Sequence, residues 1–169
     1  MSVNAQLGKG VAPQPGGFKS LSQGNYSIGY PSDWTVNTSG QMGTKFVILS
    51  PLASDSDSFQ ENVNLVIQDL SGHPLNLNDF TNLSVDQIGT FPNGRVIDKQ
   101  LQKGGGTGHE YAKIIFTGDQ NGNHLKFEQY YWIVGKEAYV LTFTALSSTF
   151  DNYKPVGEKM LNTFVFKNP

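Results

Sequence analysis

The chain has 169 residues, of which 37% are hydrophobic and 12% aromatic, enough to bury the core of one domain. Its formal net charge of −2 and its single arginine, Arg95, exclude the basic surface that nucleic acid or an acidic membrane attracts. Cysteine is absent, which excludes disulfides, thiolate nucleophiles and cysteine-based metal sites.

Polar residues dominate the first 24 positions, where Gly, Pro, Gln and Ser recur and the apolar stretch of a signal peptide is missing. We interpret residues 1–24 as a flexible leader and residues 25–169 as a single domain. Such a beginning fits a secreted domain whose signal or lipid anchor has been removed, and also a cytoplasmic protein with a loose tail. Because no run of about 18 apolar residues occurs, no membrane span is predicted.

A short alternating run opens the domain in the stretch NYSIGYPSDWTV, residues 25–36. The alternation up to Tyr30 predicts a strand that ends at Pro31, because proline cannot donate to a strand ladder. Trp34 is either an exposed aromatic platform or a core residue folded back over the sheet edge, and the usual burial of large aromatics favours the core. Two further strands are predicted at residues 45–50 and 62–70, on either side of a polar loop at 51–61.

The apolar period changes to that of a helix at residues 77–89, with Asn78 as N-cap and Gly89 as stop signal. A strand is predicted next, at residues 95–103. The run GGGTG at residues 104–108 is interpreted as a connector, because a phosphate cradle needs a helix after its glycines and a strand follows here.

Two tight turns organise residues 109–146 into a three-stranded antiparallel meander. The first turn is Asn121-Gly122, the strongest short hairpin signal, and the second is Gly135-Lys136. Both faces of the meander are rich in apolar residues, so we expect helices on each face. The turns set these residues opposite each other: Phe116 and Phe127, Ile114 and Gln129, Lys113 and Tyr130, Tyr111 and Trp132, Glu128 and Phe143, Trp132 and Tyr139.

A helical stripe marks the C-terminal segment 150–166. Pro155 places the start of this helix near Asn152, because a proline in the helix interior removes a hydrogen bond. The order of strands, helix, strands, helix predicts an α+β protein, in which an antiparallel sheet of about six to seven strands lies between helices as an α/β/α sandwich. The residues of the stripe are Phe150, Tyr153, Val156, Met160 and Phe164.

Metal-ligating residue types do not converge in this sequence. Of the three histidines, His73 stands in a loop, and the strand register puts His109 and His124 about 33 Å apart. The run DSDSFQE at 55–61 lacks the calcium-loop signature, because Phe59 stands at a ligand position. We therefore interpret its three carboxylates as parts of a solvated loop and predict no metal site: Asp55, Asp57 and Glu61.

Catalytic motifs are equally absent from the sequence. No G-x-S-x-G motif occurs, and Glu128 with Lys113 is interpreted as an ion pair at the edge of the core. We predict no catalytic residue, no cofactor and no enzyme activity. The one candidate ligand or partner surface is an aromatic row on one face of the meander, formed by Tyr111, Trp132 and Tyr139.

Several stretches, in their order and spacing over most of residues 25–166, resemble the PsbP-like family: YSIGYPSDWTV, FVILSP, ENVNLVIQDLSG, AYVLTFTA and FDNYKPVGEKMLNTFVF. This family is typified by an extrinsic subunit of the photosynthetic oxygen-evolving complex and includes prokaryotic lipoproteins. The resemblance implies an α/β/α sandwich and a small extracytoplasmic accessory domain without known catalysis. No metal-related residue of the photosynthetic members matches a position here, and residues 1–24 hold only Lys9 and Lys19 in place of their basic arm.

Two functional hypotheses follow. The first is a non-enzymatic accessory or binding module, secreted or lipid-anchored, that acts through contact with another protein outside the cytoplasm; a cytoplasmic location is the alternative. The second is a small-ligand or ion carrier with a cleft beside Tyr111, Trp132 and Tyr139. Neither involves nucleic acid or a membrane span, and an unrecognised hydrolase is a third, weaker reading.

Overall fold

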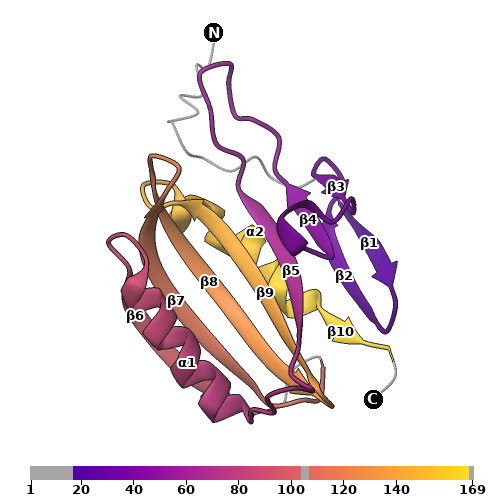
Figure 1. Ribbon diagram of the computed structural model, residues 1–169. Helices are drawn as coiled ribbons and strands as arrows, with labels where there is room; N and C mark the ends of the chain where they lie inside the picture. Colours follow the sequence, from indigo (N-terminus) through magenta and orange to yellow (C-terminus); the bar gives the residue numbers. More distant parts are fainter. Residues whose placement is uncertain (1–16, 104–106, 168–169) are drawn as a thin grey trace, which may run out of the picture.

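The computed structural model describes residues 17–103 and 107–167. In this part of the chain the helices and strands follow one another along the sequence as Figure 1 shows. Their order is β1 (Phe18–Gln23), β2 (Tyr26–Pro31), β3 (Thr35–Asn37), the 3-10 helix η1 (Gln41–Gly43), β4 (Phe46–Leu49), β5 (Asn62–Asp69), α1 (Leu77–Thr90), β6 (Arg95–Gln102), β7 (Tyr111–Gln120), β8 (Asn123–Val134), β9 (Glu137–Leu146), α2 (Phe150–Thr163) and β10 (Val165–Phe166).

The strands form two antiparallel sheets. The larger has seven strands in the order β3-β4-β5-β9-β8-β7-β6, and the smaller has three in the order β1-β2-β10. The predicted α+β class and the antiparallel sheet of six to seven strands are thus confirmed. Helix α1 lies in front of the large sheet in Figure 1 and α2 behind it, which gives the predicted α/β/α layers. The small sheet was not predicted, and it packs on the same side as α2.

The meander of β7, β8 and β9 has the predicted register. Phe116 lies opposite Phe127 and Trp132 opposite Tyr139. The first turn is of type I′, since Asn121 and Gly122 both have positive φ, at 51° and 79°. This turn type matches the twist of the strands, so the local sequence alone set the register of the largest part of the sheet.

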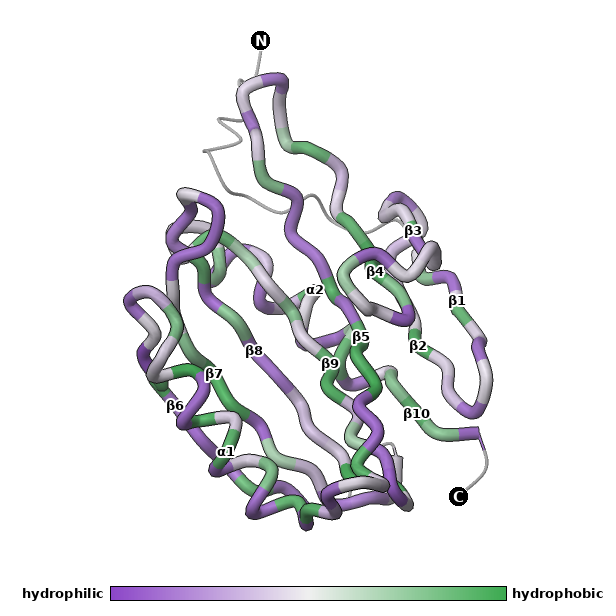
Figure 2. The backbone as a smooth tube through the Cα atoms, in the orientation of Figure 1, coloured by the Kyte–Doolittle hydropathy of each residue, from purple (hydrophilic) through white to green (hydrophobic). Residues whose placement is uncertain are grey.

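Each face of the large sheet has its own hydrophobic core. The core on the α2 face includes Trp132, Phe143 and Met160, and the core on the α1 face includes Phe80, Ile114 and Tyr131. Figure 2 shows hydrophobic and hydrophilic residues alternating along several strands of the sheet. The predicted helix on each face of the meander is confirmed, because a strand that is apolar on both sides must be covered on both.

The N-cap of helix α1 lies two residues earlier than the sequence predicts. The N-cap is Asn76, not Asn78, and its Oδ1 accepts a hydrogen bond of 2.8 Å from the backbone N–H of Asp79. The helix ends at Thr90, one residue beyond Gly89. Several Asn residues stand near this boundary, and only the path of the chain selects the one that caps the helix.

Helix α2 begins at Phe150, not near Asn152, and Pro155 lies inside it. A proline at this position removes one backbone hydrogen bond. The burial of Phe150 and Tyr153, which are 1% and 2% exposed, outweighs that loss and keeps the first turn helical. Phe164, placed on the predicted helical stripe, instead caps the C-terminus of the helix and is still buried.

The predicted leader at residues 1–24 contains a strand. Residues 1–16 lie outside the described part of the chain, but Phe18–Gln23 form β1, which pairs along its whole length with β2. Phe18 and Leu21 pack against the core on the α2 face. The strand was not predicted because the composition around it is polar and rich in glycine. An edge strand with one buried side needs only a few apolar residues, and β1 has Phe18 and Leu21.

Trp34 is a core residue, as the sequence predicts. Its backbone N–H donates a hydrogen bond of 3.0 Å to the carbonyl oxygen of Pro31, which closes a tight turn after β2. Its side chain is 7% exposed and belongs to the core on the α2 face. The Tyr-Pro-x-x-Trp stretch therefore serves to close the core.

Candidate functional site

The aromatic row predicted as a ligand surface lies largely inside the protein. Trp132 and Tyr139 are each 2% exposed, and their rings lie 5.1 Å from Phe164 and 4.9 Å from Phe166, measured between ring centroids. Tyr111 is half-buried and 5.5 Å from Trp132. Rings that pack under α2 and β10 offer a partner little contact area. A binding role of the row stays a prediction.

Tyr139 also borders a shallow hollow between the β1–β2 turn, the segment 38–45 and the ends of β5 and β9. The hollow has a volume of about 540 Å³, and its lining includes Asn25, Lys45 and Glu137. The hydroxyl group of Tyr139 lies within 3.4 Å of both Asn25 and Glu137 and is already engaged by them. This hollow is a surface depression at one end of the aromatic row, and the predicted cleft beside the row stays a prediction.

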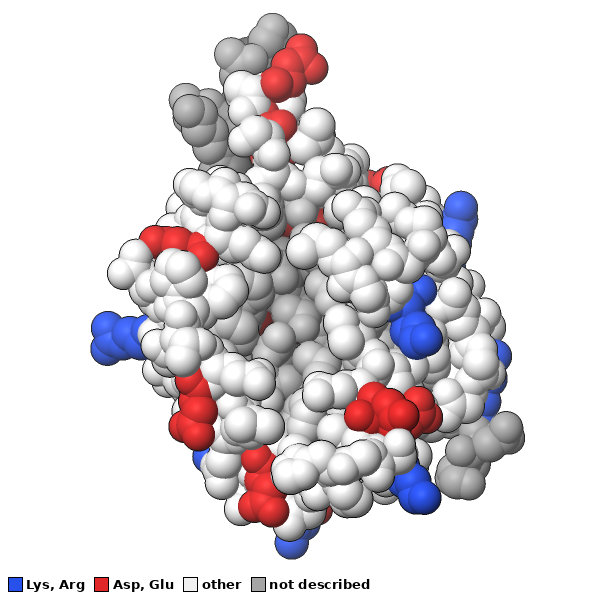
Figure 3. All heavy atoms as spheres, in the orientation of Figure 1, with Lys and Arg blue, Asp and Glu red and all other residues white. Residues whose placement is uncertain are grey.

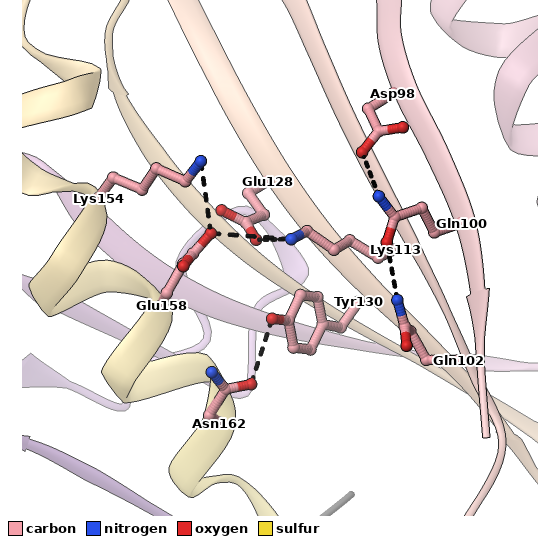
Figure 4. A network of polar contacts seen from close by, with 9 residues as sticks. All are labelled: Asp98, Gln100, Gln102, Lys113, Glu128, Tyr130, Lys154, Glu158 and Asn162. Carbon is pink, nitrogen blue, oxygen red and sulfur yellow. Dashed lines mark hydrogen bonds and ion pairs between the residues drawn. The ribbon is translucent and has the colours of Figure 1, made fainter. Parts of the chain in front are cut away.

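A buried carboxyl group lies on the α2 face of the large sheet: Glu128 on β8 is 0% exposed and faces α2. The Nζ atom of Lys113 lies 3.2 Å from its Oε1 atom, which confirms the predicted ion pair. The same Nζ atom lies 3.7 Å from Oε1 of Glu158 on α2, and the Nζ atom of Lys154 lies 3.8 Å from that same oxygen (Figure 4). Among the described residues, none donates a well-directed hydrogen bond to either carboxylate oxygen of Glu128.

Burial raises the pKa of Glu128 from 4.5 to about 7, although the ammonium group of Lys113 acts in the opposite direction. A carboxyl group with such a pKa is typical of general acids and bases. Here, however, both oxygen atoms are shut off from solvent, so no substrate can reach them. The arrangement can shift the stability of the fold with pH, and it offers no catalytic surface.

A second and larger hollow lies on the opposite face of the sheet. Helix α1 packs mainly on β6, β7 and β8, so the face of β4, β5 and β9 beside it stays open. The resulting groove has a volume of about 570 Å³ and runs between α1 and the η1–β4 segment. Figure 3 shows it as a depression near the centre of this face, with charged side chains placed mainly around the periphery.

The groove is lined by uncharged residues. Its described lining contains no Asp, Glu, Lys, Arg or His. One rung of the sheet crosses its floor, where Asn64 of β5, Thr142 of β9 and Gln129 of β8 are direct neighbours. Aromatic and aliphatic side chains form the walls. Carboxamides supply most of the polar lining: Gln41, Asn62, Asn64, Gln68, Gln87, Gln120, Asn121 and Gln129.

Hydrogen bonds hold the floor of the groove in place. Gln129 Nε2 donates to Thr142 Oγ1 at 3.1 Å, and the Tyr131 hydroxyl group donates to Gln129 Oε1. Asn64 Nδ2 donates to Asn62 Oδ1 at 3.3 Å along the neighbouring strand. These bonds fix the carboxamides before a ligand arrives, which lowers the entropy cost of binding.

The groove was not predicted, although the sequence carries a signal for it. Asn64, Gln129 and Thr142 occupy strand positions whose side chains point to the α1 face, where a fully covered sheet would carry apolar residues. A helix of 14 residues cannot cover seven strands, so part of that face had to remain open. The polar residues mark the uncovered part.

The residues considered for metal binding lie apart and have other partners. His124 pairs with Asp119, and the ring of His109 packs edge-on against Phe166. In the acidic loop, the carboxylate of Asp57 accepts hydrogen bonds from the backbone of its own loop. Glu61 points inward, where Ser50 and Thr149 donate hydrogen bonds of 3.1 and 3.2 Å to its carboxylate. Burial raises the pKa of Glu61.

Neither the models of known protein families nor the curated proteins include a match to this sequence. Solved structures do match, at low sequence identity. The solution structure of cyanobacterial PsbP (CyanoP) from Synechocystis sp. PCC 6803 superposes with a TM-score of 0.61 at 14% identity, covering 88% of this chain and 92% of that chain. This chain has the PsbP-like fold.

Two further structures share the PsbP-like fold. LpqN of Mycobacterium tuberculosis, which is involved in cell envelope biogenesis, gives a TM-score of 0.62 at 12% identity and covers 88% of this chain and 90% of that one. A protein of unknown function from Pseudomonas aeruginosa, a putative regulator, gives 0.60 at 12% identity, with coverages of 88% and 96%. The resemblance drawn from the sequence motifs is therefore confirmed for the fold. Within the described residues, neither helix is long and apolar enough to cross a membrane.

Proposed function

We propose that this protein is a non-enzymatic binding module that carries an uncharged ligand in the groove between α1 and the η1–β4 segment. The single observation behind this proposal is a hollow of about 570 Å³ whose described lining is free of charge and rich in fixed hydrogen-bonding groups. Sites for small molecules typically span about 300–1,000 Å³ and combine apolar walls with a few placed polar groups. The groove has this size and this composition.

The size of the groove favours a small ligand over a whole protein surface, since a stable protein interface needs about 800 Å² from each partner. This supports the ligand-carrier hypothesis, with the binding site on the opposite face of the sheet from the aromatic row. No acid, base or nucleophile of the described residues faces the groove with the spacing of a catalytic site, apart from hydroxyl groups. Binding without chemical conversion is therefore the proposed role.

A test uses the backbone amide spectrum of the isotope-labelled protein, titrated with fractions of a cell extract. We expect at least one fraction to shift the amide signals of β5, β8 and β9. The variant Asn64→Trp fills the groove and should abolish those shifts. The matched control Gln100→Trp places the same side chain on β6, on the other face of the sheet, and should leave the shifts unchanged. Equal responses of both variants, or no response in any fraction, would reject the groove as the binding site.

A second candidate function is an accessory role outside the cytoplasm through contact with another protein. It is supported by the shared fold of LpqN, a protein involved in cell envelope biogenesis. Cell fractionation with an antibody against this protein tests the location directly. We expect the protein in the envelope or secreted fraction, and finding it only in the cytoplasm would reject this candidate.

A further inference from the structure

The lining of the groove favours uncharged ligands over charged metabolites. Phosphates, nucleotides and carboxylates need a cation or a converging set of donors, and amines need a carboxylate or an aromatic cage. Among its described lining residues the groove offers neither a cation nor a carboxylate, and the carboxamides of its floor already spend part of their hydrogen-bonding capacity on each other. A ligand with a charge would lose its hydration without a partner to replace it.

The free hydrogen-bonding groups of the floor both donate and accept. A carboxamide carries two N–H groups and two acceptor sites, and Gln129 uses one of each on Thr142 and Tyr131. One N–H group and one acceptor site of Gln129 remain, and the hydroxyl hydrogen of Thr142 remains as a donor. Asn64 stands beside them on the same rung. Such a mixture matches hydroxyl groups, which also donate and accept at once.

Apolar faces stand next to this polar rung. The ring of Phe80 lies edge-on to Tyr131 with centroids 5.5 Å apart, and Val66 and Val140 are opposite each other on the neighbouring rung. A ligand that fits must therefore present hydroxyl groups on its edge and a C–H surface on its faces. A sugar ring has this construction, whereas an acyl chain would leave the polar rung without partners.

A peptide fits this groove less well. Main-chain recognition of a peptide uses an open strand edge. Strands β4, β5, β9 and β8, which form the floor, are each paired on both sides. A peptide helix would need an apolar floor, and the rung of Asn64, Thr142 and Gln129 is polar.

We infer that the groove binds a neutral carbohydrate, a short oligosaccharide without phosphate, carboxylate or amino groups. This inference rests on the proposed function and specifies its ligand class. The carboxamides and Thr142 would bind the ring hydroxyl groups, and the aromatic and aliphatic walls would contact the ring faces. A site built to hydrogen-bond a hydroxyl group rejects analogues that lack it, so binding is selective among sugars.

The test titrates the isotope-labelled protein with neutral oligosaccharides of glucose, galactose and N-acetylglucosamine, and with a uronic-acid oligosaccharide of equal length. We expect at least one neutral sugar to shift the amide signals of β5, β8 and β9 in a saturable way, and the acidic sugar to bind at least tenfold more weakly. Gln129→Met removes a carboxamide at nearly constant size and should weaken binding about tenfold. Asn64→Leu provides the same test if Gln129→Met fails to fold.

The matched control is Gln100→Met on β6, which removes a carboxamide from the opposite face and should leave sugar binding unchanged. An uncharged peptide mixture serves as the competing probe. If the peptide shifts the groove amides and no neutral sugar does, the carbohydrate inference is wrong while the binding groove stands. If no sugar or peptide shifts them while a cell-extract fraction still does, the inference fails and the proposed function stands; if the extract fractions also give no shift, both fail. Equal binding of the acidic sugar would also overturn the inference.

Discussion

At the scale of single residues, the most consequential side chain is Glu128. A fully buried carboxyl group is stabilised only by Lys113 at 3.2 Å, and that lysine also faces Glu158. Burial raises the pKa of Glu128 to about 7, so the group changes its charge within the physiological range. Asp98 on β6 adds a more distant negative charge near Lys113.

We predict that Glu128→Gln changes the pH dependence of stability. The pKa of Glu128 is higher in the folded than in the unfolded protein, so its contribution to stability is complete below about 4.5 and is lost as the pH rises through about 7. Glutamine has the same size and no charge. The free energy of unfolding of the variant, relative to the wild type, should therefore rise by up to about 3 kcal/mol between pH 4.5 and pH 8.

Urea denaturation of both proteins at pH 4.5, 6 and 8 measures this difference. Subtracting the wild-type curve removes contributions that the two proteins share, such as those of Glu61 and Asp119. In the variant, Lys113 keeps Glu158 as an ion-pair partner at 3.7 Å. A difference that stays constant over this pH range would show that Glu128 titrates as it does in the unfolded chain.

At the scale of secondary structure elements, two short strands complete the fold. β1 and β10 both pair with β2, and this small sheet covers the end of the core on the α2 face. Helix α2 lies close to β9, since a Cβ atom at Gly157 would come within 2.7 Å of the Phe143 ring. Elements of two to six residues thus seal a core that the long strands leave open.

We predict that β1 stabilises the protein. A chain that begins at Asn25 should be less stable than a chain that begins at Gly17, because it loses the β1–β2 ladder and the contacts of Phe18 and Leu21. Burial of these two side chains is worth about 1–3 kcal/mol. Thermal unfolding should show a melting temperature lower by several degrees. Equal melting temperatures of the two chains would mean that β1 is dispensable.

At the scale of the whole molecule, the two faces of the large sheet differ. The face behind α2 and the small sheet is sealed by aromatic contacts, and the face beside α1 keeps the groove. The charged residues examined for ion binding are engaged elsewhere: Asp57 with its own loop, and Glu61 with Ser50 and Thr149. A ligand of this fold is thus expected on the open face.

We predict that metal ions leave the stability unchanged. A ligand that binds only the folded state raises the free energy of unfolding by mass action. The melting temperature should therefore stay the same, within error, with a chelator and with millimolar Ca²⁺, Mn²⁺ or Zn²⁺. A saturable rise with any one of these ions would reveal a site, and Asp55→Asn would then test the acidic loop.

The sequence by itself determined the elements that depend on local chemistry. The Asn121-Gly122 turn fixed the register of the meander, alternation fixed its two faces, and the apolar period located both helices. The order of these elements predicted the α/β/α layers, and the resemblance of several sequence stretches pointed to the PsbP-like fold, which the solved structures share. Trp34 was predicted to be a core residue because large aromatic side chains are buried on average, and its side chain is buried.

Only the tertiary structure decided the rest, because it depends on contacts between distant segments. β1 has the composition of a loop and forms a strand because it pairs with β2. Within the predicted aromatic row, Trp132 and Tyr139 are covered by Phe164 and Phe166, which follow α2 and are distant from them in the sequence. The groove exists because α1 covers one part of the sheet and leaves Asn64, Thr142 and Gln129 open, and no local pattern encodes how far a helix reaches.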